Sequence, residues 1–171
     1  MYGVSPAFFI SLFGDRFSAA QMAEGLARLP VLGFGAYQPE IYHAAELEPW
    51  LAGGAAEVAA AGREHGLVPT QFVGHFLLHF FGNAEVLATR SGTDEFAAVC
   101  EVCREFAGMD VITVPLAAFA DGGRSYAVNY AALVEKLGRM GAVASSAGYR
   151  IALEVLPGSL LGGPAGVAPL L

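Results

Sequence analysis

Short apolar runs typical of β-strands alternate with longer helical patterns, and this alternation constrains the fold more than any other feature of the sequence. The strand-like runs cover residues 7–12, 34–41, 67–74, 111–115 and 151–155. The helical patterns between them cover residues 18–29, 47–65, 93–106 and 126–147. A repeat of about 30 to 40 residues suits βα units in which a helix covers each strand. The sequence therefore predicts an α/β fold with five parallel strands.

Capping and breaking residues refine these boundaries. Ser18 and Thr93 are the expected N-caps of two helices, and Gly148 is expected to end the last one. Pro39 cannot donate a hydrogen bond to a neighbouring strand, so the second strand should be irregular or end near it. The pair Gly53-Gly54 should weaken or split the second helix.

Composition and charge limit the classes of function. A chain of 171 residues is expected to form one domain. It is 55% hydrophobic, yet it has no run of about 18 apolar residues, so neither a transmembrane helix nor a membrane partner is expected. A parallel sheet buried on both faces explains the apolar excess. The net charge of −7 disfavours nucleic-acid binding, which needs a basic surface, and leaves a small polar metabolite as the expected partner.

The two cysteines predict neither a disulfide framework nor a zinc site. Cys100 and Cys103 lie at helical spacing within a predicted helix, and no second cysteine pair exists to complete a metal site, so core packing is the better interpretation. The segment 1–6 lacks the basic start of a signal peptide. Together these features predict a cytoplasmic protein.

Five βα units are compatible with two architectures. One is an open doubly wound, flavodoxin-like sheet, and the other is the front part of a (β/α)8 barrel, which usually needs about 250 residues. A nucleotide-binding open sheet would carry a glycine-rich phosphate loop after its first strand, but residues 14–18 match neither common motif. The barrel is therefore favoured. We expect residues 1–171 to form a single domain, with 156–171 as a truncated loop or the start of a further helix.

Polar residues recur at the predicted C-terminal ends of strands, where active sites of parallel α/β folds gather. Glu40 and His43 follow the second strand, His75 follows the third, and Glu154 lies in the apolar fifth strand. A carboxylate buried in such a run needs a partner, typically a cation. Each residue alone also has an ordinary structural interpretation, as a loop histidine, a helix-terminus contact or an arginine partner. Their shared position predicts a site at one rim of the fold.

The segment that follows the third strand is unusually aromatic. His75 and His79 have the i,i+4 spacing that binds metals on a helix. Since residues 76–81 are otherwise apolar and mostly aromatic, we expect them instead to form an aromatic wall of a substrate pocket.

Three stretches resemble the sugar phosphate isomerase/epimerase family, the xylose-isomerase-like TIM barrels. They are Tyr37-Gln38-Pro39-Glu40, Phe72-Val73-Gly74-His75 and the strand 152–158, which reads Ala-Leu-Glu-Val-Leu-Pro-Gly. The resemblance covers nearly the whole chain, but only the first five of the family's eight βα units. It implies an incomplete (β/α)8 barrel.

The resemblance also implies roles for the rim residues. Glu154 matches the first ligand of a divalent metal (Mn, Mg, Co or Zn) and is the catalytic candidate, while the remaining ligands of the family come from later strands. Glu40 and His75 would face a sugar or sugar-derived substrate, and His43 is expected to be a further substrate-binding residue. The implied reaction is proton transfer next to a carbonyl through an enediolate.

Since Glu154 is the only metal ligand that the resemblance supplies, the chain by itself is expected to be inactive and need bind no metal. One alternative is a non-catalytic fragment or half-barrel that works by association, with exposed strand edges pairing in a homo-oligomer. The endonuclease IV branch is less favoured because the fourth strand ends without a histidine and the chain is acidic.

Overall fold

The structure is a computed structural model that describes residues 2–162 and Gly166. Of the segment 156–171, which the sequence predicts to be a truncated loop or the start of a further helix, residues 156–162 contain turns. The remainder of that prediction, except Gly166, lies outside the described residues.

All strands are parallel, and they form two hydrogen-bonded sheets of order β1-β2-β4 and β3-β5-β6-β7. Their bounds are β1 (Gly3–Val4), β2 (Ala36–Tyr37), β3 (Glu40–Ile41), β4 (Val68–Pro69), β5 (Phe72–Gly74), β6 (Val111–Leu116) and β7 (Arg150–Val155). β2 and β3 are two halves of one strand, interrupted at Gln38 and Pro39. β4 and β5 are likewise two halves of the next strand. The part of the chain that the structure describes therefore has five strand positions, the number that the sequence predicts.

The order of these positions decides the architecture. Each position lies beside the one before it in the chain, from β1 to β7. In a doubly wound sheet the order reverses at a switch point, whereas barrel strands follow one another around the axis. Since no reversal occurs among the described strands, the predicted partial barrel is confirmed and the flavodoxin-like alternative is wrong.

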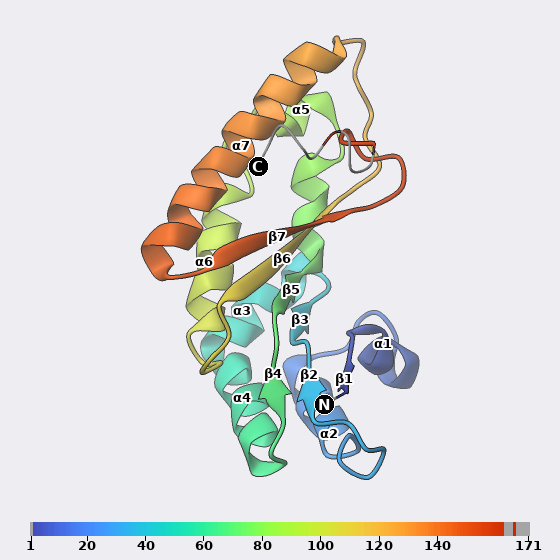
Figure 1. The fold of residues 1–171 in the computed structure, drawn as a ribbon, viewed down its shortest axis with the longest axis vertical. Coiled ribbons are helices and arrows are strands. Elements are labelled where there is room, and N and C mark those ends of the chain that lie inside the picture. The colour runs from blue at the N-terminus through green and yellow to red at the C-terminus, as the bar shows by residue number, and fades with distance from the viewer. Residues whose placement is uncertain (1, 163–165, 167–171) are drawn as a thin grey trace.

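Helices follow the strand positions and flank the sheet. Figure 1 shows α4, α6 and α7 on the left of the strands and the short α1 on the right. The helical bounds are α1 (Ala7–Phe13), α2 (Ala19–Leu26), η1 (Ala44–Glu46), α3 (Leu47–Pro49), η2 (Trp50–Gly54), α4 (Ala55–Glu64), η3 (His75–Phe81), α5 (Ala84–Leu87), α6 (Thr93–Cys103) and α7 (Tyr126–Ala147).

Several local predictions are confirmed. Ser18 caps α2, because its Oγ accepts a hydrogen bond from the Gln21 N–H (3.2 Å) and Gln21 Oε1 accepts one from the Ser18 N–H (2.9 Å). Gly148 ends α7 in the left-handed conformation, with φ 84°. Gly53 has φ 129° inside the π-helical turn η2, and this turn separates α3 from α4 as predicted for the glycine pair. The second strand is interrupted at Pro39.

Two boundary predictions are wrong. Residues 7–12 form the helix α1 rather than the first strand, which is the earlier pair Gly3–Val4. A short apolar run does not distinguish strand from helix by itself, and Pro6, with φ −52°, is preorganised to start a helix. Thr93 is the first residue of α6 rather than its N-cap. Gly92 takes the N-cap position, and its N–H donates to Glu95 Oε2 at 2.9 Å.

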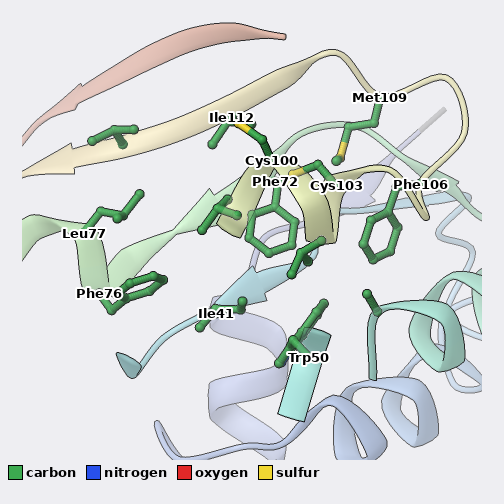
Figure 2. Close-up of a cluster of buried hydrophobic side chains, with 14 of the residues drawn as sticks. Ile41, Trp50, Phe72, Phe76, Leu77, Cys100, Cys103, Phe106, Met109 and Ile112 are labelled. Carbon is green, nitrogen blue, oxygen red and sulfur yellow. The ribbon is translucent and has the colours of Figure 1, made fainter. Parts of the chain in front are cut away.

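The hydrophobic core lies between the strands and the helices that cover them (Figure 2). Trp50 of η2 meets Phe72 of β5 edge to face, with ring centroids 5.7 Å apart. Cys100 and Cys103 of α6 are free thiols buried in this core, and burial raises the pKa of Cys100 to about 11. The packing role predicted for both cysteines is confirmed.

Candidate functional site

A cavity of about 580 Å³ lies against the strands of the partial barrel. Every second residue of the second and third strand positions lines it, because successive side chains of a strand point to opposite faces. These residues are Gln38, Glu40 and Tyr42 from the second position and Gln71, Val73 and His75 from the third. The fifth position contributes Ala152, Leu153, Glu154 and Leu156. This face corresponds to the interior of a complete barrel.

The strand register stacks these residues in layers. Glu40 pairs with Val73, Val73 with Thr113, and Thr113 with Ala152, so these four residues form one layer across the sheet. Glu154 lies two residues further toward the C-terminal rim of its strand, opposite Pro115. All four residues of the layer and Glu154 line the cavity.

Glu40 is the buried acid of the site. Its side chain is 3% exposed, and Oε2 has no hydrogen-bond partner among the described residues. Burial, with a smaller contribution from Glu154, raises the pKa of Glu40 to about 8. At neutral pH Glu40 is therefore mainly a carboxylic acid that can donate a proton or a hydrogen bond.

His75 lies beside Glu40 and beneath an aromatic ring. Its Nδ1 is 3.8 Å from Glu40 Oε1, and the Tyr42 ring stacks on the imidazole with centroids 4.1 Å apart and an interplanar angle of 8°. Burial lowers the pKa of His75, and His79 and His43 lower it further. A neutral imidazole therefore faces a neutral carboxyl group at neutral pH. This contact is neither an ion pair nor, at that distance, a hydrogen bond.

The burial of the two glutamates is the reverse of what the sequence suggests. Glu154, expected to be buried in an apolar strand and in need of a cation, is exposed at the rim. Glu40, which begins β3 directly after the interruption at Pro39, is the buried carboxyl group. β7 is half-exposed or exposed along its whole length among the described residues, whereas both residues of β3 are buried.

His43 lies at the margin of this site and does not line the cavity. Its Nε2 is 3.6 Å from Asp15 Oδ2, in the loop after α1, and its ring meets Tyr42 edge to face at 5.0 Å. The structure thus brings Glu40, His75 and Glu154 to one cavity. His43 does not line this cavity and contacts Tyr42, which does.

The predicted aromatic wall is wrong. No residue of 76–81 lines the cavity, and Phe76, Leu77 and Phe81 are buried in the hydrophobic core instead. Residues 75–81 form a 3₁₀ helix, and His79 is exposed. The aromatic residue of the site is Tyr42.

Sequence reasoning missed the uncharged polar residues of the cavity. Gln38, Gln71, Thr113 and Ser5 all line it. The signal that would have found the first three is the alternation itself: Gln38 lies two residues before Glu40, Gln71 lies four before His75, and Thr113 is a polar residue within a buried strand. A prediction based on ionisable residues alone does not include them.

The described residues supply only part of a metal site. Within 2–162 and Gly166, no group of three or more His, Cys, Asp or Glu side chains could hold a metal ion. Glu154 can offer one carboxylate oxygen, which suits a hard divalent cation. Glu40 is mainly protonated at neutral pH and must lose its proton before it can ligate. The residues thus fit one ligand of a metal and not a complete coordination shell.

Among the described residues, no helix combines the length and the apolar character needed to cross a membrane.

Comparison with known proteins identifies the fold. No family model matches the sequence, and no curated protein matches it. Solved structures do match, and they are sugar phosphate isomerase/epimerase and xylose-isomerase-like TIM barrel proteins. At 20% identity or less, this likeness establishes a shared fold.

Three of these structures show the extent of the match. The zinc-bound IolI protein aligns with a TM-score of 0.66 at 17% identity, over 92% of this chain and 53% of its own. The Escherichia coli 3-keto-D-glucoside 4-epimerase YcjR aligns with a TM-score of 0.60 at 19% identity, over 84% of this chain and 54% of its own. A sugar phosphate isomerase/epimerase from Parabacteroides distasonis aligns with a TM-score of 0.59 at 13% identity, over 90% of this chain and 50% of its own. The chain thus spans about half the length of these structures.

Proposed function

We propose that residues 1–171 are the N-terminal part, as one domain, of a divalent-metal-dependent sugar isomerase or epimerase. The observation that carries this proposal is the convergence of Glu40, His75 and Glu154, from three strand positions, on one cavity. Support comes from the fold, which the chain shares with a 3-keto-D-glucoside 4-epimerase and with a sugar phosphate isomerase/epimerase.

The positions of the residues suggest a division of roles. Glu154 is exposed at the rim, where a carboxylate can take a proton from a carbon next to a carbonyl and return it. Glu40 and His75 lie deeper and are neutral at neutral pH, so they suit hydrogen bonds to sugar oxygens better than proton abstraction. His43 lies close to Asp15 at the margin of the cavity, and its ring contacts the ring of Tyr42, which lines the cavity.

The metal is part of the proposal because a neighbour of this fold, IolI, binds zinc. Glu154 is the residue of this chain that would contribute to holding a divalent cation (Mn, Mg, Co or Zn). A bound cation would polarise the carbonyl oxygen of the sugar. The other ligands would have to come from outside the described residues, so this chain alone is expected to be inactive.

The test is solvent-deuterium exchange into a ketose, followed by NMR. A version of the protein that carries a complete barrel is incubated with D-fructose and Mn²⁺ in D₂O, and the loss of the proton signal next to the carbonyl is measured. Glu154→Gln should slow exchange by at least about a hundredfold, since it removes the group that moves the proton.

The matched control is Glu48→Gln, which changes an exposed glutamate of α3 and should leave the exchange rate unchanged. Equal exchange rates for the wild type and Glu154→Gln would contradict the role of Glu154. A complete barrel with no exchange in any ketose or aldose tested would contradict the proposed reaction.

A second candidate function is supported by the sheet edges. Among the described strands, β1 and β7 each pair on one side only. Such edges can pair with another chain. A half-barrel that closes by association with a second copy would elute as a dimer in size-exclusion chromatography with light scattering. A monomer across a wide range of protein concentration would argue against it.

A further inference from the structure

β7 is an edge strand that another strand could pair with along its whole length. Among the described strands it is hydrogen-bonded to β6 alone, and its residues Arg150–Val155 pair with that strand in unbroken register. It contains neither a proline nor a bulge, two of the features that protect an edge. The edge at β1 consists only of Gly3–Val4, too short to hold a partner strand. An association through a sheet edge would therefore use β7 (Figure 1).

The backbone hydrogen bonds of β7 show which of its residues face the free edge. The Arg150 N–H donates to the carbonyl oxygen of Asp110, the residue before β6, at 2.8 Å. In a parallel ladder, successive residues bond alternately to the two sides of the strand. The even-numbered residues of β7 therefore bond to β6. Ile151, Leu153 and Val155 direct their N–H and C=O groups to the free edge.

This alternation limits how two copies of β7 can pair. Copies related by a two-fold axis perpendicular to the sheet pair antiparallel, and residues whose N–H and C=O groups are free must lie opposite one another. One such register places Ile151 of each copy opposite Leu153 of the other and centres Ala152 on the axis. It also places Arg150 of each copy opposite Glu154 of the other. The strand is thus complementary in charge to its own inverted copy.

The two charged residues select this register over its neighbours. A slip of two residues separates Arg150 from Glu154, and a slip of four places two like charges opposite each other, which destabilises a strand pair. Both side chains are exposed and available for pairing. Arg150 already donates to Asp110 Oδ2 through Nη2 (2.7 Å), but its guanidinium has five N–H donors and can bind a second carboxylate.

One flank of α7 leaves room for a partner helix beside this edge. Lys136 and Arg139 donate to backbone carbonyl groups of the turn before α6, so the opposite flank of α7 faces away from α6. That flank carries Val134, which is 41% exposed, with Gly138 and Gly141. A Cβ atom added to either glycine would meet no atom of the described residues within 4 Å. The same two-fold axis brings the two α7 helices together on one face of the sheet.

We propose that two copies of this chain associate by antiparallel pairing of their β7 strands, centred on Ala152 and held in register by two Arg150–Glu154 ion pairs. The inference deepens the second candidate function and rests on it for the association with a second copy. It adds an arginine of the other copy to the rim of the cavity. Since this arginine occupies the Glu154 carboxylate, the dimer and a complete metal-binding barrel are alternative uses of the same strand.

Charge-reversed variants test the register. Arg150→Glu makes both positions acidic and Glu154→Arg makes both basic, so each variant opposes like charges in its own dimer. Each should dimerise at least about tenfold more weakly than the wild type. An equimolar mixture of the two should form a heterodimer about as tight as the wild-type dimer, because every opposed pair then carries opposite charges. Sedimentation velocity over a dilution series at low salt measures these affinities.

The matched control is Arg28→Glu, a charge reversal at an exposed position outside the proposed interface. It should dimerise like the wild type, and mixing it with Glu154→Arg should not rescue that variant by forming a tight heterodimer. A wild-type chain that stays monomeric at every concentration would overturn the proposal. So would a mixture of Arg150→Glu and Glu154→Arg that associates no more tightly than either variant alone.

Oxidative cross-linking gives an independent readout. In the proposed register, Ala152→Cys places two thiols opposite each other in a non-hydrogen-bonded pair, with Cα atoms about 4.5 Å apart, within the range of a disulfide. Mild oxidation should therefore convert this variant to a covalent dimer, seen by non-reducing electrophoresis. Val31→Cys, at a position 90% exposed on the loop before β2, controls for random collision and should cross-link far more slowly. Equal rates would contradict the proposal.

These measurements are independent of the proposed reaction. They use residues 1–171 without metal or substrate, whereas the deuterium exchange is measured on a protein that carries a complete barrel. Failure of the pairing would leave the exchange result unchanged, and failure of the exchange would leave the pairing unchanged.

Discussion

Glu40 in the cavity and Lys136 on α7 are both almost completely buried ionisable residues, yet the protein surrounds them in opposite ways. Lys136 Nζ donates hydrogen bonds to the carbonyl oxygens of Val86 (2.9 Å) and Ser91 (2.8 Å). Glu40 has one carboxyl oxygen without a partner among the described residues and the other 3.8 Å from a histidine. Both pKa values shift toward the neutral form, to about 8 in each case.

Lys136 is a structural anchor. Its two acceptors belong to α5 and to the turn before α6, so one ammonium group fastens this segment to α7. The rings of Phe80 and Phe81 lie 6.0 and 5.8 Å from Nζ and add favourable cation–π contacts. Comparison with Glu40 shows that a buried ionisable residue whose hydrogen bonds are satisfied holds the fold together. One with an unpaired atom is costly to keep charged, and it is kept in its neutral form.

The largest expected effect is a pH dependence of stability that Glu40 imposes. Its pKa is about 8 in the folded protein against a usual value of 4.5, so between these values the folded state holds a proton that the unfolded state has lost. Stability should therefore fall as the pH rises from 4.5 to 8, by on the order of 4 kcal/mol. Urea unfolding across this range measures it. Glu40→Gln should remove this decline, and an equal decline in the variant would refute the assignment.

Replacement of the anchor should be nearly as costly. Lys136→Met keeps the length of the side chain but removes both hydrogen bonds of the ammonium group. The Ser91 carbonyl then has no donor among the described residues, whereas the Val86 carbonyl still accepts from Thr89. The loss of stability should be about 3 kcal/mol. Chemical denaturation measures this loss. Arg28→Met, at an exposed position of the turn after α2, serves as control and should change stability by less than about 0.5 kcal/mol. A similar small change for Lys136→Met would show that the anchor contributes little.

The same lysine should contribute to stability with the opposite sign above pH 8. Its pKa is about 8 when folded and 10.5 otherwise, chiefly because burial disfavours its charge, so between these values the unfolded state holds the extra proton. Lys136 should therefore contribute a rise in stability of about 2 to 3 kcal/mol over this range. The buried Cys100 and Cys103, whose pKa values are raised by burial, contribute an opposing fall above pH 9, so the Lys136 contribution is read as the difference between the pH profiles of the wild type and Lys136→Met. Parallel profiles above pH 8 would mean that Lys136 does not titrate as described.

The smallest effects should differ in sign. Ser18→Ala removes a cap whose hydroxyl is satisfied and should cost about 1 kcal/mol. Thr113→Val removes a buried hydroxyl that has no partner among the described residues and should leave stability unchanged or raise it by about 1 kcal/mol. Thermal unfolding of both variants, each compared with wild type, tests this. A loss for Thr113→Val as large as that for Ser18→Ala would show that its hydroxyl is satisfied in solution.

Most of the fold follows from the sequence because its strongest signals are local. The helix 126–147 has a complete apolar pattern with Ser125 before it and Gly148 after it, and its bounds are correct. The first strand is wrong because it contains only Gly3 and Val4, too few residues for any periodicity, and is defined by pairing with β2 rather than by its own sequence. Pairing with a distant segment is invisible in a local pattern.

The candidate site is predictable only in part. The rule that polar groups gather at strand ends finds Glu40, His75 and Glu154, and the structure brings them to one cavity. It does not find Thr113, which lies within a strand, nor does it tell which glutamate is buried. Burial depends on which segments pack over each strand, and that is a property of the assembled fold.

Lys136 has one more consequence, because it is the only lysine among the 171 residues. With its ammonium group buried, the side chains of the folded protein offer no accessible amine for acylation or reductive methylation. Reagents that modify lysine can react with this side chain only when the segment between α5 and α6 parts from α7. The rate of that single modification, read by mass spectrometry, would therefore report the local opening of this region directly, without any introduced label.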